Sequence, residues 1–194
     1  GNFCPMPAVF PDYSGPILRG QADGSLLLAR ARWGMPSSRK ALLEAATRRA
    51  DKLRAKGKAF DFDDVLRMEP DKGTTNIRRT ESRHWWPWLA PENRCLVPFT
   101  AFNEPDQVNR GDSVWFALGE DLPLAFFAGV WTPHACVRMI SKGWEELDAY
   151  GFLTTDANAD VAPFHPKAMP VILRTVEERD VWIRAPWDLS LIHI

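Results

Sequence analysis

The sequence is poor in several features that mark particular classes of protein. It has 3 cysteines in 194 residues, and they show no CxxC or His/Cys spacing, which argues against a disulfide framework and against a zinc site. No apolar run reaches the roughly 18–20 residues of a membrane helix, and the N-terminus lacks a basic-then-apolar signal pattern. Neither sign of charge dominates, since 24 Lys and Arg face 25 Asp and Glu. These absences favour a soluble protein of a reducing cytoplasm.

Tryptophan, by contrast, is abundant, and the charges are unevenly distributed. The chain has 9 Trp, several of them near Pro or Arg, where flat rings can line a groove as readily as a core. Residues 1–80 hold 15 Lys and Arg against 9 Asp and Glu, whereas residues 81–194 hold 9 against 16. A near-neutral chain with one basic half can bind an anion locally, although solvated helix faces explain the same pattern.

Hydrophobic periodicity predicts a domain in which helices and strands are largely segregated. An apolar stripe at helical spacing runs through residues 38–58, formed by Leu42, Ala46, Ala50 and Leu53, and the other face is rich in Arg and Lys. Further helices are expected at 61–68 and 176–183. Short apolar runs predict strands at 25–33, 95–102, 114–118, 124–131, 150–155 and 169–173. This pattern favours an α+β fold with a curved mixed or antiparallel sheet, or a partial β-barrel, and peripheral helices.

Four local patterns contain residue types that could carry chemistry. They are Trp33-Gly34-Met35-Pro36, Thr75-Asn76-Ile77-Arg78, the segment 94–104 that ends in Asn103-Glu104, and His165-Pro166-Lys167-Ala168-Met169-Pro170. Taken alone, Asn76 could cap a turn and His165 could be an ordinary loop histidine. Glu104 is harder to explain structurally, because a carboxylate next to the apolar Phe99 and Phe102 is costly to bury unless it is paired.

In this order the four patterns resemble the SOS response-associated peptidase (SRAP) family, whose members shield abasic sites in single-stranded DNA. The resemblance extends from about Pro11 to Trp187 and implies the fold of that family. It implies catalytic roles for Asn76, Glu104 and His165. It implies DNA contacts for Arg78, Lys167 and the turn Trp33, Gly34, Met35 and Pro36. The sequence itself gives no evidence for a metal, a cofactor or a membrane segment.

The resemblance also implies a reaction and a setting. An abasic sugar opens to an aldehyde, which the α-amine of an N-terminal cysteine attacks to give an imine; the thiol then closes a thiazolidine ring. Glu104 would move the protons and His165 would protonate the departing hydroxyl. Asn76 would orient the amine or the sugar, and Arg78 would pair with a phosphate. The expected protein is a monomer of the bacterial cytoplasm, associated with the nucleoid, with a peptidase-type self-cleavage that frees the cysteine.

The chain departs from the family pattern at its ends. Its first cysteine is Cys4, whose nitrogen belongs to a peptide bond and is not nucleophilic. We therefore expect residues 1–188 to be a single SRAP-like domain that lacks its N-terminal segment and that in this form does not crosslink. Residues 189–194 are expected to be a non-native tail.

Smaller departures affect the interior. Pro105 stands where many members have an aromatic residue, Ala168 is an extra residue in the histidine motif, and the basic helix 38–58 looks like an insertion.

Two alternative functions follow from the same residues. One is a module that binds single-stranded DNA without catalysis. The other is an unrelated hydrolase that uses Cys95 or Cys136 with His165, although both cysteines are typical of small core residues. His84 and His134 are expected at the surface or in turns.

Overall fold

The framework of the fold is a ring of five strands. The computed structural model describes residues 6–109 and 111–190. Around the ring, neighbouring strands pair in the order β1 (Ser14–Gly20), β2 (Leu26–Trp33), β8 (Trp144–Thr155), β7 (Ala125–Val137) and β4 (Arg94–Phe99), and β4 pairs again with β1. The ring is closed, and within it β2 and β8 run parallel while the other pairs are antiparallel. The expected α+β fold with a curved mixed sheet is confirmed, and the barrel is complete rather than partial.

Short strands extend the barrel at one end of β8 and β7. They are β3 (Asn76–Ile77) and β9 (Met169–Pro170), which both pair with β8, and β10 (Ile172–Leu173), which pairs with β7. A separate hairpin is formed by β5 (Ala101–Pro105) and β6 (Ser113–Ala117). The strand predicted over 95–102 was wrong in one respect, since the chain leaves the barrel at Thr100 and enters this hairpin. A continuous apolar run cannot show where a chain changes sheet.

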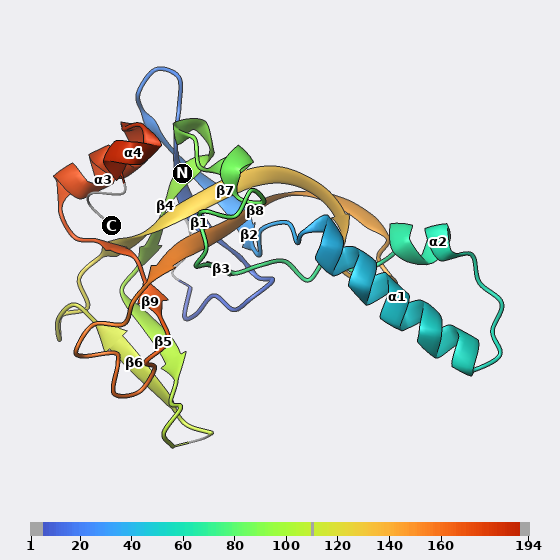
Figure 1. Ribbon diagram of the computed structural model, residues 1–194. Coiled ribbons are helices and arrows are strands. Elements are labelled where there is room, and N and C mark those ends of the chain that lie inside the picture. The colour runs from blue at the N-terminus through green and yellow to red at the C-terminus, as the bar shows by residue number, and fades with distance from the viewer. Residues whose placement is uncertain (1–5, 110, 191–194) are drawn as a thin grey trace.

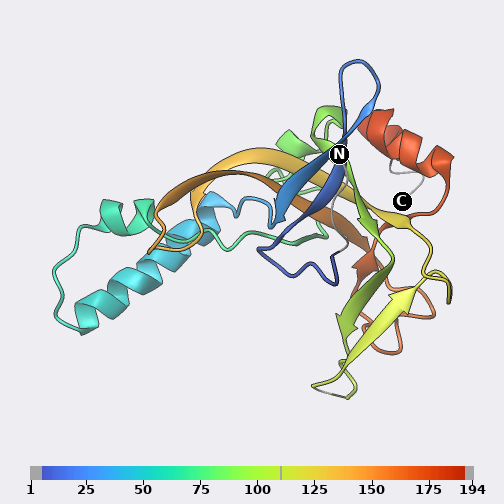
Figure 2. The same ribbon diagram turned by 180° about the vertical axis from the view of Figure 1, so that it is seen from behind.

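The helices lie outside the barrel, and α1, α2 and α3 correspond to the three helices expected from the sequence. They are α1 (Arg39–Ala55), α2 (Phe62–Arg67), α3 (Val176–Arg184) and α4 (Trp187–Ser190), with short 3-10 helices η1 (Trp86–Trp88) and η2 (Pro91–Asn93). Ser38 and Asp61 cap α1 and α2 through their side chains, and Thr175 begins α3 with a capping box. Figures 1 and 2 show α3 and α4 against the barrel, whereas α1 and α2 project from it as an arm.

Apolar side chains pack on both faces of the barrel strands. One cluster includes Ile17, Val97, Phe127 and Phe152, and the other includes Leu96 and Val130 together with Trp182 of α3. The Trp182 indole N–H reaches between two strands and donates to the carbonyl oxygens of Cys95 and Gly129 at 3.0 and 3.2 Å. This double contact fixes α3 across the junction of β4 and β7.

The C-terminal helix is held by a buried arginine. Arg94 is fully buried and donates to the carbonyl oxygens of Leu89, Trp182 and Ala185 and to the hydroxyl of Ser190. Leu189 and Ser190, which begin the expected tail, therefore belong to α4, and Ser190 is itself buried. Residues 191–194 lie outside the described chain, as does Cys4. Within the described ranges, no helix combines the length and apolar character needed to cross a bilayer.

Candidate active site

A carboxylate and an imidazole meet between the β5–β6 hairpin and the loop that follows β8. Glu104 Oε2 lies 3.6 Å from His165 Nδ1, and the two side chains are 17% and 18% exposed. Glu104 stands on β5 opposite Val114, and Phe102 stands opposite Phe116. Because side chains alternate along a strand, Glu104 shares its face with these aromatic rings. The strand register thus carries an ionisable group to the edge of an apolar surface.

The loop before β9 is fixed by its own hydrogen bonds. The side-chain oxygen of Asn158 accepts from the Val161 amide at 3.0 Å, and the Val161 carbonyl accepts from the His165 amide at 2.8 Å. Gln107 joins this loop to the hairpin, since its amide donates to the Phe164 carbonyl at 2.9 Å. The Gln107 side-chain nitrogen also lies 3.2 Å from His165 Nδ1. His165 is therefore held from both sides.

Burial changes the acidity of the Glu104 carboxyl. Loss of water raises its pKa above the ordinary value, and the nearby His165 imidazole opposes the shift when it is charged. A carboxyl whose pKa is raised by burial holds a proton more readily than an exposed one, which suits it to exchange protons with a bound substrate. This combination is typical of sites that catalyse proton transfer.

A row of aromatic rings, buried at Phe127 and Phe152, connects this pair to Trp33 at the end of β2. Successive ring centroids lie 4.8–6.1 Å apart along Trp33, Phe152, Phe127, Phe102, Phe116 and Phe164. Phe164 directly precedes His165, and the Trp33 indole donates to the carbonyl of Thr75 at 3.1 Å. The row therefore runs from the histidine loop to the residue that precedes Asn76.

Asn76 and Arg78 lie at this second end of the row. Asn76 is exposed on β3, opposite Phe152 of β8, and within the described residues no hydrogen bond joins its side chain to Glu104 or His165. Arg78 is paired with Asp156, the residue that follows β8. The structure thus brings Glu104 and His165 together, and the convergence of Asn76 with them stays a prediction.

The expected DNA-contacting turn is mostly interior. Gly34, Met35 and Pro36 are buried, and Trp33 is half-buried. Met35 exchanges two backbone hydrogen bonds with Thr74, at 2.9 and 2.7 Å. These three residues therefore position the segment before Asn76, while Trp33 remains partly available to a ligand. Lys167 is exposed in its turn.

A polar network that the sequence did not reveal fixes the base of the same segment. The buried carboxylate of Asp71 accepts from the amides of Ser37 and Gly73 and from His134 Nε2 at 3.0 Å. Arg138 donates to the carbonyls of Asp71 and Gly34 at 2.8 and 2.6 Å. His134, expected at the surface or in a turn, instead lies on β7 and is half-buried in this network. No sequence motif marks Asp71, because it acts by joining segments that are far apart in the chain.

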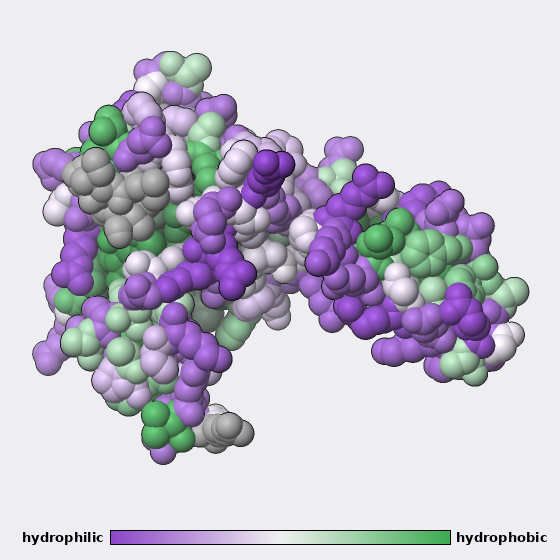
Figure 3. Space-filling view, viewed as in Figure 1, coloured by the Kyte–Doolittle hydropathy of each residue, from purple (hydrophilic) through white to green (hydrophobic). Residues whose placement is uncertain are grey.

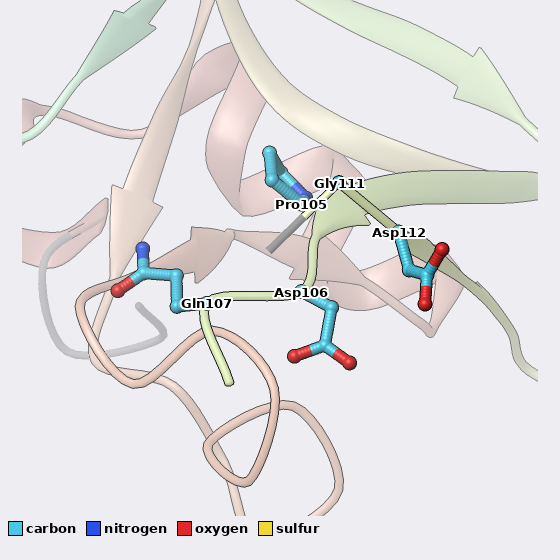
Figure 4. Close-up of a pocket in the computed structure, with 5 residues that line it drawn as sticks. All are labelled: Pro105, Asp106, Gln107, Gly111 and Asp112. Atoms are coloured by element: carbon cyan, nitrogen blue, oxygen red, sulfur yellow. The ribbon is translucent and has the colours of Figure 1, made fainter. Parts of the chain in front are cut away.

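A hollow adjoins the β5–β6 hairpin, as Figure 4 shows. It has a volume of about 520 Å³ and is lined by Pro105, Asp106, Gln107, Gly111 and Asp112. Its two carboxylates come from Asp106 and Asp112, and the Asp106 carboxylate accepts from the amides of Val108 and Asn109, which lowers its pKa. Gln107 therefore lies between this hollow and His165.

Neither described cysteine is placed as a nucleophile. Cys95 and Cys136 are buried, and burial raises the pKa of both thiols. Thiolate chemistry needs a lowered pKa and access to a substrate. The alternative of a cysteine hydrolase therefore has no support in the described structure, where no cluster of three or more metal-ligating side chains occurs either.

The fold is a closed five-stranded barrel with peripheral helices, and it brings a carboxylate and an imidazole together beside aromatic rings. The family model described as SOS response associated peptidase (SRAP) matches residues 2–192. The chain belongs to this family. Membership associates it with the SOS response, with abasic-site processing in DNA damage, and with a peptidase label.

Solved structures agree with this fold assignment. A protein of Bordetella bronchiseptica has a TM-score of 0.61 at 24% identity, with 98% of this chain and 82% of that one covered. A protein of Bacteroides thetaiotaomicron has a TM-score of 0.58 at 18% identity, covering 94% and 68%. A phage-related protein of B. bronchiseptica gives 0.56 at 17%, covering 94% and 71%. Comparison with curated proteins finds no match.

Proposed function

We propose that this protein binds single-stranded DNA on the surface between Trp33 and the Glu104–His165 pair and, when it carries the N-terminal cysteine of its family, forms a covalent crosslink with abasic sites. The observation that supports this most directly is the 3.6 Å approach of Glu104 to His165 beside an aromatic surface. Partly exposed rings offer stacking platforms for unpaired bases, each worth about 1–3 kcal/mol. Arg78 supplies a charge for the phosphate backbone.

The reaction requires proton transfers that the pair is suited to make. The α-amine adds to the sugar aldehyde carbon, and the resulting carbinolamine loses its hydroxyl as water to give an imine. The thiol sulfur then bonds to the imine carbon while its proton passes to the nitrogen, which closes the thiazolidine ring. Glu104 accepts and returns protons on the amine, and His165 protonates the departing hydroxyl. Asn76 orients the amine or the sugar from the other side.

The test is an adduct assay on the protein extended at its N-terminus by a segment whose first residue is cysteine, so that this cysteine has a free α-amine. It is incubated with single-stranded DNA containing an abasic site and then denatured. We expect an adduct that survives denaturation, that is absent with intact DNA, and that is lost when the N-terminal cysteine is replaced by alanine.

Glu104→Gln and His165→Ala should slow adduct formation while DNA binding is retained. A protein that binds DNA but forms no adduct would instead be a single-strand binding module without catalysis. Failure to bind single-stranded DNA at all would exclude both functions.

A further inference from the structure

A pocket at the α4 end of the barrel is distinct from the candidate active site. Its volume is about 540 Å³, and its walls come from η1, η2 and α4 together with the segments next to them. Figures 1 and 2 show α4 at the end of the barrel opposite the β5–β6 hairpin, which carries Glu104. Neither Glu104 nor His165 lines this pocket. It is therefore a separate cavity that the proposed reaction does not use.

The wall of the pocket is largely apolar. Its apolar residues are Trp86, Leu89, Ala90, Pro91 and Trp187. Trp86 is 57% exposed and Trp187 is half-buried, so both indoles are accessible to a ligand. Figure 3 shows hydrophobic side chains among hydrophilic ones at the end of the molecule that carries α3 and α4. A cavity of this size with an apolar wall and few polar groups is typical of a site for a small organic ligand.

Arg94, which also lines the pocket, has one nitrogen without a partner. Its Nε and Nη1 donate to the acceptors already described, whereas Nη2 is buried and forms no hydrogen bond within the described residues. No carboxylate of the described chain forms an ion pair with the guanidinium either. Burial lowers the pKa of Arg94 to about 10, against the opposing influence of Glu92, so the group is charged at neutral pH. A buried charge with an unpaired donor indicates a missing anionic partner.

The neighbours of the guanidinium place it at the pocket wall. Leu89 lines the pocket, and its carbonyl accepts from Arg94 Nε at 2.9 Å. The Trp187 ring centroid lies 5.6 Å from the guanidinium carbon. Because Nη2 is covered, the Trp187 ring must shift as a carboxylate enters. The carboxylate then replaces a weak cation–π contact by a stronger, charge-assisted hydrogen bond with Nη2.

The other two polar residues of the pocket restrict the charge of the ligand. Thr80 is half-buried and its hydroxyl forms no hydrogen bond within the described ranges, which leaves a donor for the second carboxylate oxygen. Glu81 is exposed and disfavours a second negative charge at the rim. One buried cation, one hydroxyl and one opposing carboxylate together favour a monocarboxylate over a phosphate.

We propose that this pocket binds an organic monocarboxylate, whose carboxylate pairs with Arg94 Nη2 and whose apolar part packs against Trp86 and Trp187. The inference goes beyond the proposed function and does not depend on it. A free small acid and the C-terminal end of a peptide chain present the same carboxylate, and the two sources are distinguished by their affinities.

The test compares a carboxylate with its uncharged amide. 3-Phenylpropionate and 3-phenylpropionamide have the same shape, and their affinities for the unchanged protein are measured by isothermal titration calorimetry. Ala90→Phe fills the pocket without removing Arg94, and Ala41→Phe, at an exposed position of α1, is the matched control. Trp86→Ala removes an exposed ring from the rim and serves as a second variant. Circular dichroism confirms that each variant folds.

We expect the carboxylate to bind at least tenfold more tightly than the amide, because only the carboxylate pairs with the buried charge. Ala90→Phe should weaken its binding at least tenfold and Trp86→Ala about threefold, whereas Ala41→Phe should change it less than twofold. Since a buried pair is little screened, raising the salt concentration from about 0.05 to about 0.5 M should weaken binding less than threefold.

A peptide probe distinguishes the two sources of the carboxylate. N-acetyl-alanyl-phenylalanine has a free C-terminal carboxylate next to an aromatic side chain. Tighter binding of this peptide than of 3-phenylpropionate identifies the end of a peptide chain as the ligand, and weaker binding identifies a small acid.

Three results would overturn the inference, and none of them bears on adduct formation. If the amide binds as tightly as the carboxylate, Arg94 does not receive the ligand. If Ala90→Phe and Trp86→Ala both leave the affinity unchanged, the acid binds elsewhere on the protein. If neither the acid nor the peptide binds at about 10 mM, where even a binding free energy of about −3 kcal/mol is detectable, the pocket is not a carboxylate site.

Discussion

His165 Nδ1 lies 3.6 Å from Glu104 Oε2, although one residue stands in a loop after β8 and the other on the β5–β6 hairpin. Both side chains are largely buried, and burial raises the pKa of the Glu104 carboxyl. The loop is fixed to the hairpin by Gln107, so the distance is set by the backbone of two elements. Because the two side chains are already in position, a proton can be transferred without prior reorganisation of the site.

Replacing Glu104 by glutamine should slow adduct formation without lowering the free energy of unfolding. Because the folded-state pKa is raised, ionisation of Glu104 favours the unfolded chain, and stability declines as pH rises from about 4.3. Glu104→Gln removes this decline, so its urea-unfolding free energy near pH 7 should equal or exceed that of the unchanged protein. Adduct formation should slow by about 10²-fold or more. A variant less stable than the parent near pH 7 would show that the carboxylate has a structural role.

Gln107 should orient the His165 imidazole for proton transfer. Its side-chain nitrogen lies 3.2 Å from Nδ1, so Gln107→Glu places a second carboxylate beside the imidazole and favours its charged form. The basic limb of the pH profile for adduct formation should move to higher pH, whereas Gln107→Ala should lower the rate without such a shift. DNA affinity, measured by anisotropy, serves as the control. An unchanged profile in both variants would mean that this contact does not orient the imidazole.

Local patterns predicted most of the long helices and strands, whereas the connections between distant segments required the structure. Periodicity placed α1 and α3 within a few residues, because capping by Ser38 and Thr175 is a local property. Glu104 stood out because a carboxylate beside an apolar strand needs a partner, and the structure supplies His165. The strand break at Thr100 and the closure of the barrel depend on pairings between segments far apart in the chain.

The buried base of the arm was invisible in the sequence for the same reason. Asp71, His134 and Arg138 come from two distant segments, and no spacing rule links them. The turn Trp33–Pro36 was expected to touch DNA, yet Gly34, Met35 and Pro36 are buried. A motif shows that residues matter without showing whether they contact a ligand or hold a neighbour that does.

Gly73 should be among the least replaceable residues of the arm base. Its φ is +73°, and an added Cβ would lie 2.5 Å from Arg138 Nη1 and 2.7 Å from Gly34 Cα. Gly73→Ala should therefore cost about 3 kcal/mol or more in urea unfolding, since strain adds to a backbone clash. Gly57 has a φ of +65° with nothing within 4 Å, so Gly57→Ala should cost only about 1 kcal/mol. If Gly73→Ala and Gly57→Ala lose the same free energy of unfolding, the surrounding chain moves to relieve the clash at position 73.

Asp71 should make the free energy of unfolding decrease as the pH falls into the acidic range. Its hydrogen bonds with His134, Ser37 and Gly73 hold the pKa of the buried carboxyl far below its usual range. A depressed folded-state pKa gives stability that is present above the unfolded pKa of about 3.9 and is lost as pH falls below it. Asp71→Asn should be less stable at neutral pH by about 2–4 kcal/mol and should show a weaker loss between about pH 5 and 3. Parallel pH curves for the two proteins, measured by urea unfolding, would contradict this account.

The ion pair between Arg78 and Asp156 should restrain DNA binding. Asp156 is 93% exposed and Arg78 is 42% exposed, so the pair contributes little to stability, but it occupies a guanidinium that we assign to a phosphate. Asp156→Asn should therefore tighten binding of single-stranded DNA by a few-fold at low salt, whereas Arg78→Gln should weaken it and reduce the log–log salt slope by about 0.7. Both variants should unfold at nearly the same urea concentration as the parent. Because the two substitutions act on one guanidinium, Arg78→Gln should abolish the gain from Asp156→Asn in the double variant. If that gain persists without Arg78, the Asp156 charge repels DNA on its own and Arg78 is not the phosphate contact.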